Sequence, residues 1–103
     1  MESKEQTLAD IETAYEKAFA KAKDAGTRLK AARGRYHIEL LARREAGEKL
    51  TVADIKAYEA VAIDDVDYVR DAYLNYTKAH SELLTAKVAK DQAVRDYWDS
   101  KGR

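Results

Sequence analysis

The two histidines are the side chains of this sequence best suited to metal binding or proton transfer. Helical bundles that hold a pair of iron ions place a glutamate three residues before each histidine ligand. Gly34 stands three residues before His37, and Thr77 stands three residues before His80, so this spacing is missing. His80 falls on an apolar stripe of a predicted helix, where we expect a buried or interfacial side chain. The histidines therefore predict no metal site.

Three oxygen-bearing side chains follow one another at intervals of four residues, as on one face of a helix. They are Asp67, Asp71 and Asn75. A rigid helix brings too few oxygens together for Ca²⁺, so we expect these side chains to be solvated or paired with bases. The sequence also has no cysteine, no glycine-rich phosphate loop and no Gly-x-Ser-x-Gly motif. We therefore predict a protein that is not an enzyme and holds no cofactor or metal.

Basic residues are concentrated between positions 21 and 44, a pattern that suits contact with nucleic acid. The candidate contacts are Lys30, Arg33, Arg35, Arg43 and Arg44. Acidic residues between positions 54 and 71 are expected to lie beside this stretch and to cancel its field, and the whole chain has a formal net charge of zero. Association with nucleic acid is therefore the alternative function and not the preferred one.

The stretch from Leu8 to Tyr36 shows the strictest spacing in the chain, because its apolar residues recur in steps of three and four. They are Leu8, Ile11, Tyr15, Ala18, Ala22, Ala25, Leu29, Ala32 and Tyr36. This is the a/d seam of a helix packed lengthwise against another helix. Gly26 and Gly34 mark a bend or a close approach of two backbones, and we expect the helix to continue through both.

Local signals predict where the helices begin and end. Ser3, with Gln6 three residues later, has the form of an N-terminal capping box. Gly47 suits the left-handed residue that ends many helices, and Thr51 followed by Asp54 looks like the next N-cap. The predicted elements are a first helix over about 4–46, a turn over about 46–51 and a second helix over about 52–101.

The predicted second helix carries its own seam with alanine at every seventh position. Its members are Val69, Ala72, Tyr76, Ala79, Leu83, Ala86, Lys90, Ala93 and Tyr97. A short turn makes the two helices antiparallel neighbours, and folding the chain there places Ala22 opposite Tyr76 and Tyr15 opposite Leu83. The predicted fold is all-α, a long antiparallel two-helix hairpin that is coiled-coil-like, with an alanine-rich seam, in a single domain over 1–103.

The second helix has more apolar surface than one partner helix covers. The surplus side chains are Ile63, Val66, Tyr73, His80, Leu84, Val94 and Trp98, and the first helix adds Phe19, Ile38, Leu40 and Leu41. Tyr97, at the end of the seam, is also included in the predicted partner-binding surface. Apolar stripes of this kind mark interfaces, so we predict dimerisation into a four-helix bundle or a complex with another protein. Val94, Tyr97 and Trp98 are expected to extend beyond the first helix and to lack intrachain partners.

The N-terminal residues have no apolar signal core, and no run of apolar residues is long enough to span a bilayer. We therefore expect a cytoplasmic protein without a membrane partner. The predicted function is that of a non-enzymatic protein–protein interaction module that acts through the surplus apolar face. A structural component, an adaptor or a small inhibitor of a larger protein, including one of viral origin, all fit this prediction.

Overall fold

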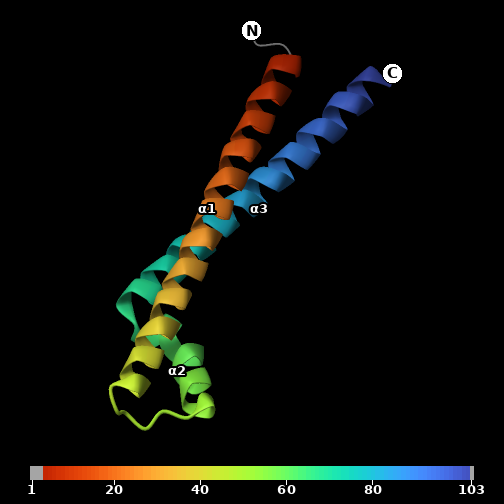
Figure 1. The fold of residues 1–103 in the computed structure, drawn as a ribbon. Helices are drawn as coiled ribbons and strands as arrows, with labels where there is room; N and C mark the ends of the chain where they lie inside the picture. Colours follow the sequence, from red (N-terminus) through yellow and green to blue (C-terminus); the bar gives the residue numbers. More distant parts are fainter. Residues whose placement is uncertain (1–3, 103) are drawn as a thin grey trace. The chain divides into compact units, whose positions relative to one another are not determined.

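The computed structural model describes residues 4–102, which form three α-helices joined by short connections (Figure 1). The helices are α1 (Lys4–Glu45), α2 (Val52–Asp65) and α3 (Asp67–Lys101). The all-α prediction is confirmed, and the prediction of only two helices is wrong. The predicted capping residue Ser3 lies outside the described residues.

Helix α1 runs without a break through Gly26 and Gly34, as predicted. All nine seam positions between Leu8 and Tyr36 are buried or half-buried, whereas most of the positions between them are exposed. The seam of α3, from Val69 to Tyr97, shows the same pattern. The two heptad patterns therefore identify correctly which faces of α1 and α3 turn away from water.

The connection between α1 and α2 closes with two local hydrogen-bonded motifs. The backbone N–H of Glu48 donates to the carbonyl of Arg43 (3.1 Å) and that of Gly47 donates to Arg44 (3.2 Å), which is the Schellman pattern. Gly47 has a φ of 111°, a conformation that glycine adopts without steric cost. Thr51 and Asp54 exchange side chain and backbone hydrogen bonds of 3.1 and 2.9 Å in a capping box. Both predicted helix boundaries are confirmed.

Replacing Thr51 with alanine removes the acceptor for the Asp54 backbone N–H at the start of α2. We expect the free energy of unfolding to fall by about 1 kcal/mol, the usual cost of losing such a cap. Urea unfolding monitored by circular dichroism measures this loss. Thr51→Ser keeps the hydroxyl and is the matched control, and equal stability of the alanine and serine variants would contradict the role of the cap.

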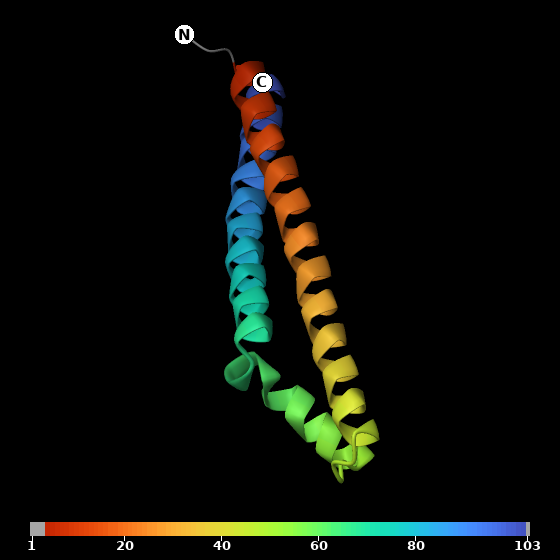
Figure 2. The same ribbon diagram turned by 60° about the vertical axis from the view of Figure 1, so that its left-hand side comes forward.

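The predicted second helix is interrupted at Val66, which has extended backbone angles (φ −113°, ψ 114°). The Val66 N–H still donates to the Ala62 carbonyl (2.9 Å), so it closes α2. The Val66 carbonyl accepts the N–H of Arg70 (2.8 Å), so it also opens α3. In Figure 2 the chain changes direction at this junction. A single residue therefore divides the predicted helix into two.

Aspartates explain why the break falls here, although neither proline nor glycine is present. Asp64 and Asp65 stand at the C-terminal end of α2, where the helix dipole disfavours negative charge, and Asp67 stands in the first turn of α3, where it is favoured. The Arg70 guanidinium donates to the Asp64 carbonyl (3.2 Å) and to the Asp67 carboxylate (2.6 Å). Arg70 therefore links the end of one helix to the start of the next.

The described chain divides into two compact units, and α1 and α3 are antiparallel in both. The terminal unit contains residues 4–23 and 78–102, and the turn unit contains residues 24–77. Ala22 and Ala79 are the buried apolar residues of the terminal unit. The buried apolar residues of the turn unit are Ala25, Leu40, Ile55, Ala62 and Val69. Small side chains therefore form the core of one unit, and larger ones contribute to the core of the other.

The register of α1 against α3 differs from the predicted one. In the terminal unit Lys21 pairs with Glu82 (3.2 Å). The predicted register places Tyr76 opposite Ala22, the residue after Lys21, so the observed partner lies further along α3 than predicted. The Lys90 ammonium lies 4.4 Å from the centroid of the Tyr15 ring, further along α3 than the predicted partner Leu83. Because α2 is inclined and the helix breaks at Val66, α3 meets α1 later in the sequence than predicted. The register of α1 against α3 is therefore displaced.

Candidate interaction surfaces

Many large apolar side chains of the described residues are exposed, which is consistent with binding a partner. They are Phe19, Ile38, Val52, Tyr58, Val61, Leu74, Leu84, Val88 and Trp98. Leu40, predicted to be part of this surplus, is instead completely buried. It follows Tyr36 by four residues and so continues the α1 seam within the turn unit.

One exposed face of α3 lies entirely within the terminal unit, and we call it the α3 outer face. Its residues recur in steps of three and four and are Leu84, Lys87, Asp91, Arg95 and Trp98. Leu84 is 52% exposed and Trp98 is 62% exposed. The three charged residues between them have no intrachain partner among the described residues, although their spacing would allow pairs along the helix. The face is therefore apolar at both ends and charged in the middle.

The predicted interface residues are divided between the two units. Ile63, Val66 and Tyr73 belong to the turn unit, and all three are half-buried. In the terminal unit, His80, Leu84 and Trp98 are exposed, whereas Val94 and Tyr97 are half-buried. The His80 side chain is therefore not buried within the chain, which was one of the two predicted placements.

Tyr97 has intrachain contacts, contrary to prediction. Its ring packs edge-on against Trp98 with 5.6 Å between the centroids, and the Lys101 ammonium lies 4.8 Å from its centroid. Val94 is also partly covered. The contacts of the Tyr97 ring come from neighbouring residues of α3. Trp98 is thus the apolar side chain at this end that remains mostly exposed.

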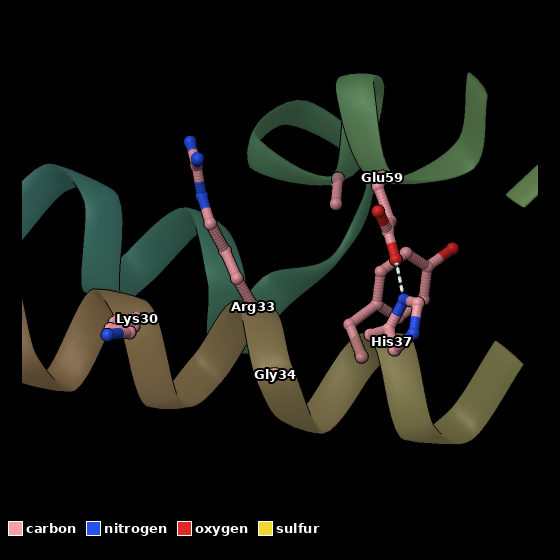
Figure 3. A pocket seen from close by; sticks show the side chains of 7 residues that line it. Lys30, Arg33, Gly34, His37 and Glu59 are labelled. Atoms are coloured by element: carbon pink, nitrogen blue, oxygen red, sulfur yellow. Dashed lines mark hydrogen bonds and ion pairs between the residues drawn. The ribbon is translucent and has the colours of Figure 1, made fainter. Parts of the chain in front are cut away.

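The turn unit contains two open hollows that share the side chains of Lys30 and Arg33. The first has a volume of about 390 Å³ and is lined by Lys30, Arg33, Gly34, Tyr36, His37, Glu59 and Ala62 (Figure 3). The second has a volume of about 430 Å³ and is lined by Gly26, Leu29, Lys30, Arg33, Tyr73 and Tyr76. Nδ1 of His37 contacts the Glu59 carboxylate across the first hollow. We call the two hollows together the α1 groove.

Glycine has a different environment at each end of the α1 groove. At Gly26, a methyl group would lie 3.5 Å from the Tyr76 ring, which is ordinary contact. At Gly34, it would meet nothing within 4 Å. A glycine inside a helix costs roughly 1 kcal/mol relative to alanine, and packing within the described chain does not account for this cost at Gly34. Both glycines stand out in the sequence, but the groove between them cannot be located from the sequence because its lining comes from segments far apart in the chain.

The five predicted nucleic-acid contacts do not form one free basic face. Arg35 is bound to Glu39 (3.2 Å) and Arg43 to Glu48 (2.9 Å), whose hydrogen bond and negative charge raise the pKa of the Arg43 guanidinium. Lys30, Arg33 and Arg44 have no intrachain partner among the described residues. The free positive charge available to a phosphate backbone is therefore smaller than the sequence indicates.

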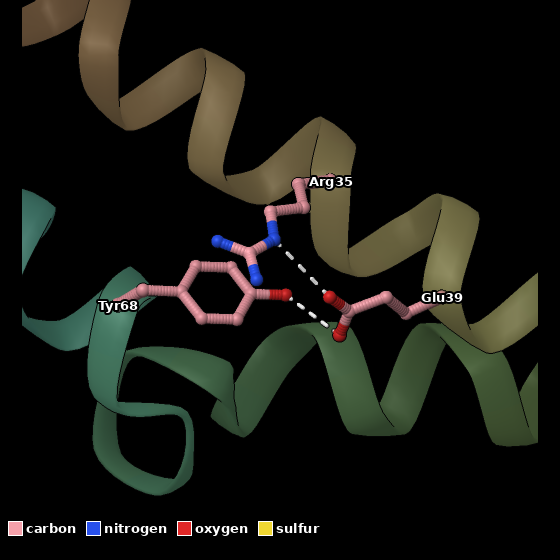
Figure 4. A network of polar contacts seen from close by, with 3 residues as sticks. All are labelled: Arg35, Glu39 and Tyr68. Carbon is pink, nitrogen blue, oxygen red and sulfur yellow. Dashed lines mark hydrogen bonds and ion pairs between the residues drawn. The ribbon is translucent and has the colours of Figure 1, made fainter.

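A three-residue network connects α1 to the start of α3 in the turn unit (Figure 4). The Tyr68 hydroxyl donates to one oxygen of the Glu39 carboxylate (2.9 Å), and Arg35 donates to the other oxygen (3.2 Å). The Arg35 guanidinium also stacks 4.1 Å from the centroid of the Tyr68 ring. Burial, together with the hydrogen bond and negative charge of Glu39, raises the pKa of the Tyr68 hydroxyl.

The raised pKa of Tyr68 predicts a loss of stability at alkaline pH. The folded state holds the Tyr68 phenol proton more tightly than the unfolded chain does, and this difference stabilises the folded state. The stabilisation is fully present below a pH of about 10, the ordinary pKa of tyrosine, and is lost as the pH rises through the folded pKa. We expect the stability of Tyr68→Phe to decline less steeply than that of the wild type in this alkaline range.

Urea unfolding at a series of pH values, with phenolate absorbance as a second measurement, tests this prediction. Tyr58→Phe is the matched control, because it removes one phenol that has no hydrogen-bond partner among the described residues. Parallel stability curves for the wild type and Tyr68→Phe above pH 10 would contradict the proposed linkage.

Comparisons with protein-family models, curated proteins and solved structures found no match to this chain. None of the described helices is long and apolar enough to cross a membrane. Among the described residues there is also no group of three histidine, aspartate or glutamate side chains arranged to hold a metal ion. The α3 outer face and the α1 groove are the candidate sites for binding a partner.

Proposed function

We propose that this protein is a non-enzymatic protein–protein interaction module that associates with a second copy of itself through the α3 outer face. The observation that supports this most directly is the exposure of Leu84 and Trp98 on one side of a helix whose other side is already packed. Tryptophan is enriched among the residues that contribute most to binding energy at protein interfaces. Burying both side chains in each copy would remove substantial apolar surface from water.

The spacing on this face suits an antiparallel pair related by twofold symmetry. Leu84 and Trp98 are 14 positions apart, close to four helical turns. An antiparallel second copy centred on Asp91 therefore brings Leu84 of each chain opposite Trp98 of the other. The same pairing places Asp91 opposite Asp91 of the second copy, with Lys87 and Arg95 of that copy one turn away on either side. These three charges have no intrachain partner among the described residues, so the Asp91 carboxylates are available to pair with the flanking bases of the second copy.

Sedimentation velocity over a wide concentration range tests this proposal. We expect the wild type to dimerise and Leu84→Asp to weaken the dimer by at least about 100-fold, because twofold symmetry introduces the buried charge twice. Leu74→Asp is the matched control, since Leu74 is an exposed leucine of the same helix outside the α3 outer face, and it should dimerise like the wild type. A wild type that stays monomeric throughout would overturn the proposal.

A further inference from the structure

The α1 groove combines apolar walls with two unsatisfied cations. Lys30 and Arg33 line both hollows and have no intrachain partner in the described part of the chain. Nearby arginines of α1 are neutralised, since Arg28 binds Asp24 (2.8 Å) and Arg35 binds Glu39 (3.2 Å). The free positive charge in this part of α1 is therefore concentrated at the groove.

The lining of the groove favours an apolar occupant beside those cations. Leu29, Tyr36, Tyr73 and Tyr76 contribute aliphatic and aromatic surface. The acid of the groove, Glu59, contacts the His37 ring and lines only the first hollow, whereas Lys30 and Arg33 line both hollows. A nucleic-acid backbone would contact only two free cations here, and its phosphates would gain nothing from the apolar walls. An acidic protein segment with apolar side chains fits the groove better.

Gly26 and Gly34, which each line only one of the two hollows, are about as far apart along α1 as side chains two turns apart on a partner helix. Gly26 lines one hollow and Gly34 lines the other, and eight helical residues correspond to a rise of about 12 Å. Two apolar side chains seven residues apart on a partner helix are separated by about 10.5 Å along its axis. The bare backbone at Gly34, where an added methyl group would meet nothing within 4 Å, leaves room for one of them.

We propose that the α1 groove binds an amphipathic helix of a partner protein that carries two apolar side chains seven residues apart and acidic residues between them. The apolar side chains enter the two hollows, and the carboxylates pair with Lys30 and Arg33. This is the helix-in-groove mode of recognition. The site shares no residue with the α3 outer face, so it does not depend on self-association.

Fluorescence anisotropy with a labelled helical peptide tests the site. The probe carries leucine at two positions seven apart and glutamate at the third and fourth positions between them, and a second probe has lysine in place of glutamate. We expect the acidic probe to bind the wild type at least about tenfold more tightly than the basic probe. The double variant Lys30→Glu and Arg33→Glu should lose at least about tenfold in affinity for the acidic probe.

Two further variants separate this site from a general charge effect. Lys49→Glu with Lys56→Glu makes the same change in net charge outside the groove and should bind the acidic probe within about twofold of the wild type. Gly34→Leu fills the first hollow, and it should weaken binding at least about tenfold while circular dichroism shows an intact helix. Equal losses in the two double variants, no binding of the acidic probe, or tighter binding of a single-stranded nucleic acid would each overturn the proposal. Failure of the dimerisation test would leave this result unaffected.

Discussion

Replacing Leu40 with alanine is expected to lower the free energy of unfolding by about 2–5 kcal/mol, the largest effect that we predict for a single substitution in this chain. Leu40 has no solvent exposure and belongs to the turn unit, whose other buried residues include Ile55 and Val69. Truncation removes the transfer free energy of the buried side chain and leaves a cavity that the surrounding side chains fill only in part. Urea unfolding measures the difference.

Ile38→Ala is the matched control for this substitution. Ile38 lies two residues away on the same helix but is 66% exposed, so its truncation should change the stability by only about 0.5 kcal/mol. If Ile38→Ala destabilised the protein as strongly as Leu40→Ala, the core of the turn unit would have to be assigned differently. A reduced urea midpoint with an unchanged slope would locate the effect in the folded state.

The second large effect is expected from Ala79→Leu. Ala79 is only 3% exposed and lies in the terminal unit, where the buried apolar residues are alanines. A larger side chain must push α1 and α3 apart or adopt an unfavourable rotamer, so we expect a loss of about 1–3 kcal/mol. The effect of overpacking opposes the gain in hydrophobic burial, and in a closely packed alanine seam overpacking is the larger of the two.

Ala89→Leu provides the control for Ala79→Leu on the same helix. Ala89 is exposed, and leucine is nearly as good a helix former as alanine, so the stability should stay within about 0.5 kcal/mol of the wild type. Urea unfolding of the two variants at one protein concentration measures the contrast. A neutral result for Ala79→Leu would show that the two helices do not approach closely at this position.

Leu40 and Tyr97 illustrate what the heptad pattern predicts correctly and what it does not. Both lie on or next to a heptad seam, and the pattern correctly assigned the faces on which the seams lie. The predicted exposure of Leu40 was wrong because α2 folds back within the turn unit, where Leu40 is buried. The predicted lack of partners for Tyr97 was wrong because Trp98 and Lys101 of the same helix contact its ring. The burial of Leu40 depends on segments far apart in the chain, whereas the contacts of Tyr97 are local.

The break at Val66 left a weak signal in the sequence. Asp64, Asp65 and Asp67 are poor helix formers, and their charges suit the start of α3 better than the end of α2. The apolar spacing on both sides is continuous enough to hide this signal. The guanidinium of Arg70 bridges the two helices across the break.

The helical content, the C-terminal end of α1, the start of α2 and the faces of α1 and α3 that pack all follow from local patterns in the sequence. These properties depend on hydrogen bonds and side chain spacings within a few residues, such as the capping box of Thr51 and the left-handed Gly47. The tertiary structure alone decided the register, the burial of Leu40 and the α1 groove. These depend on how segments far apart in the chain meet, and a break of one residue at Val66 is enough to change that.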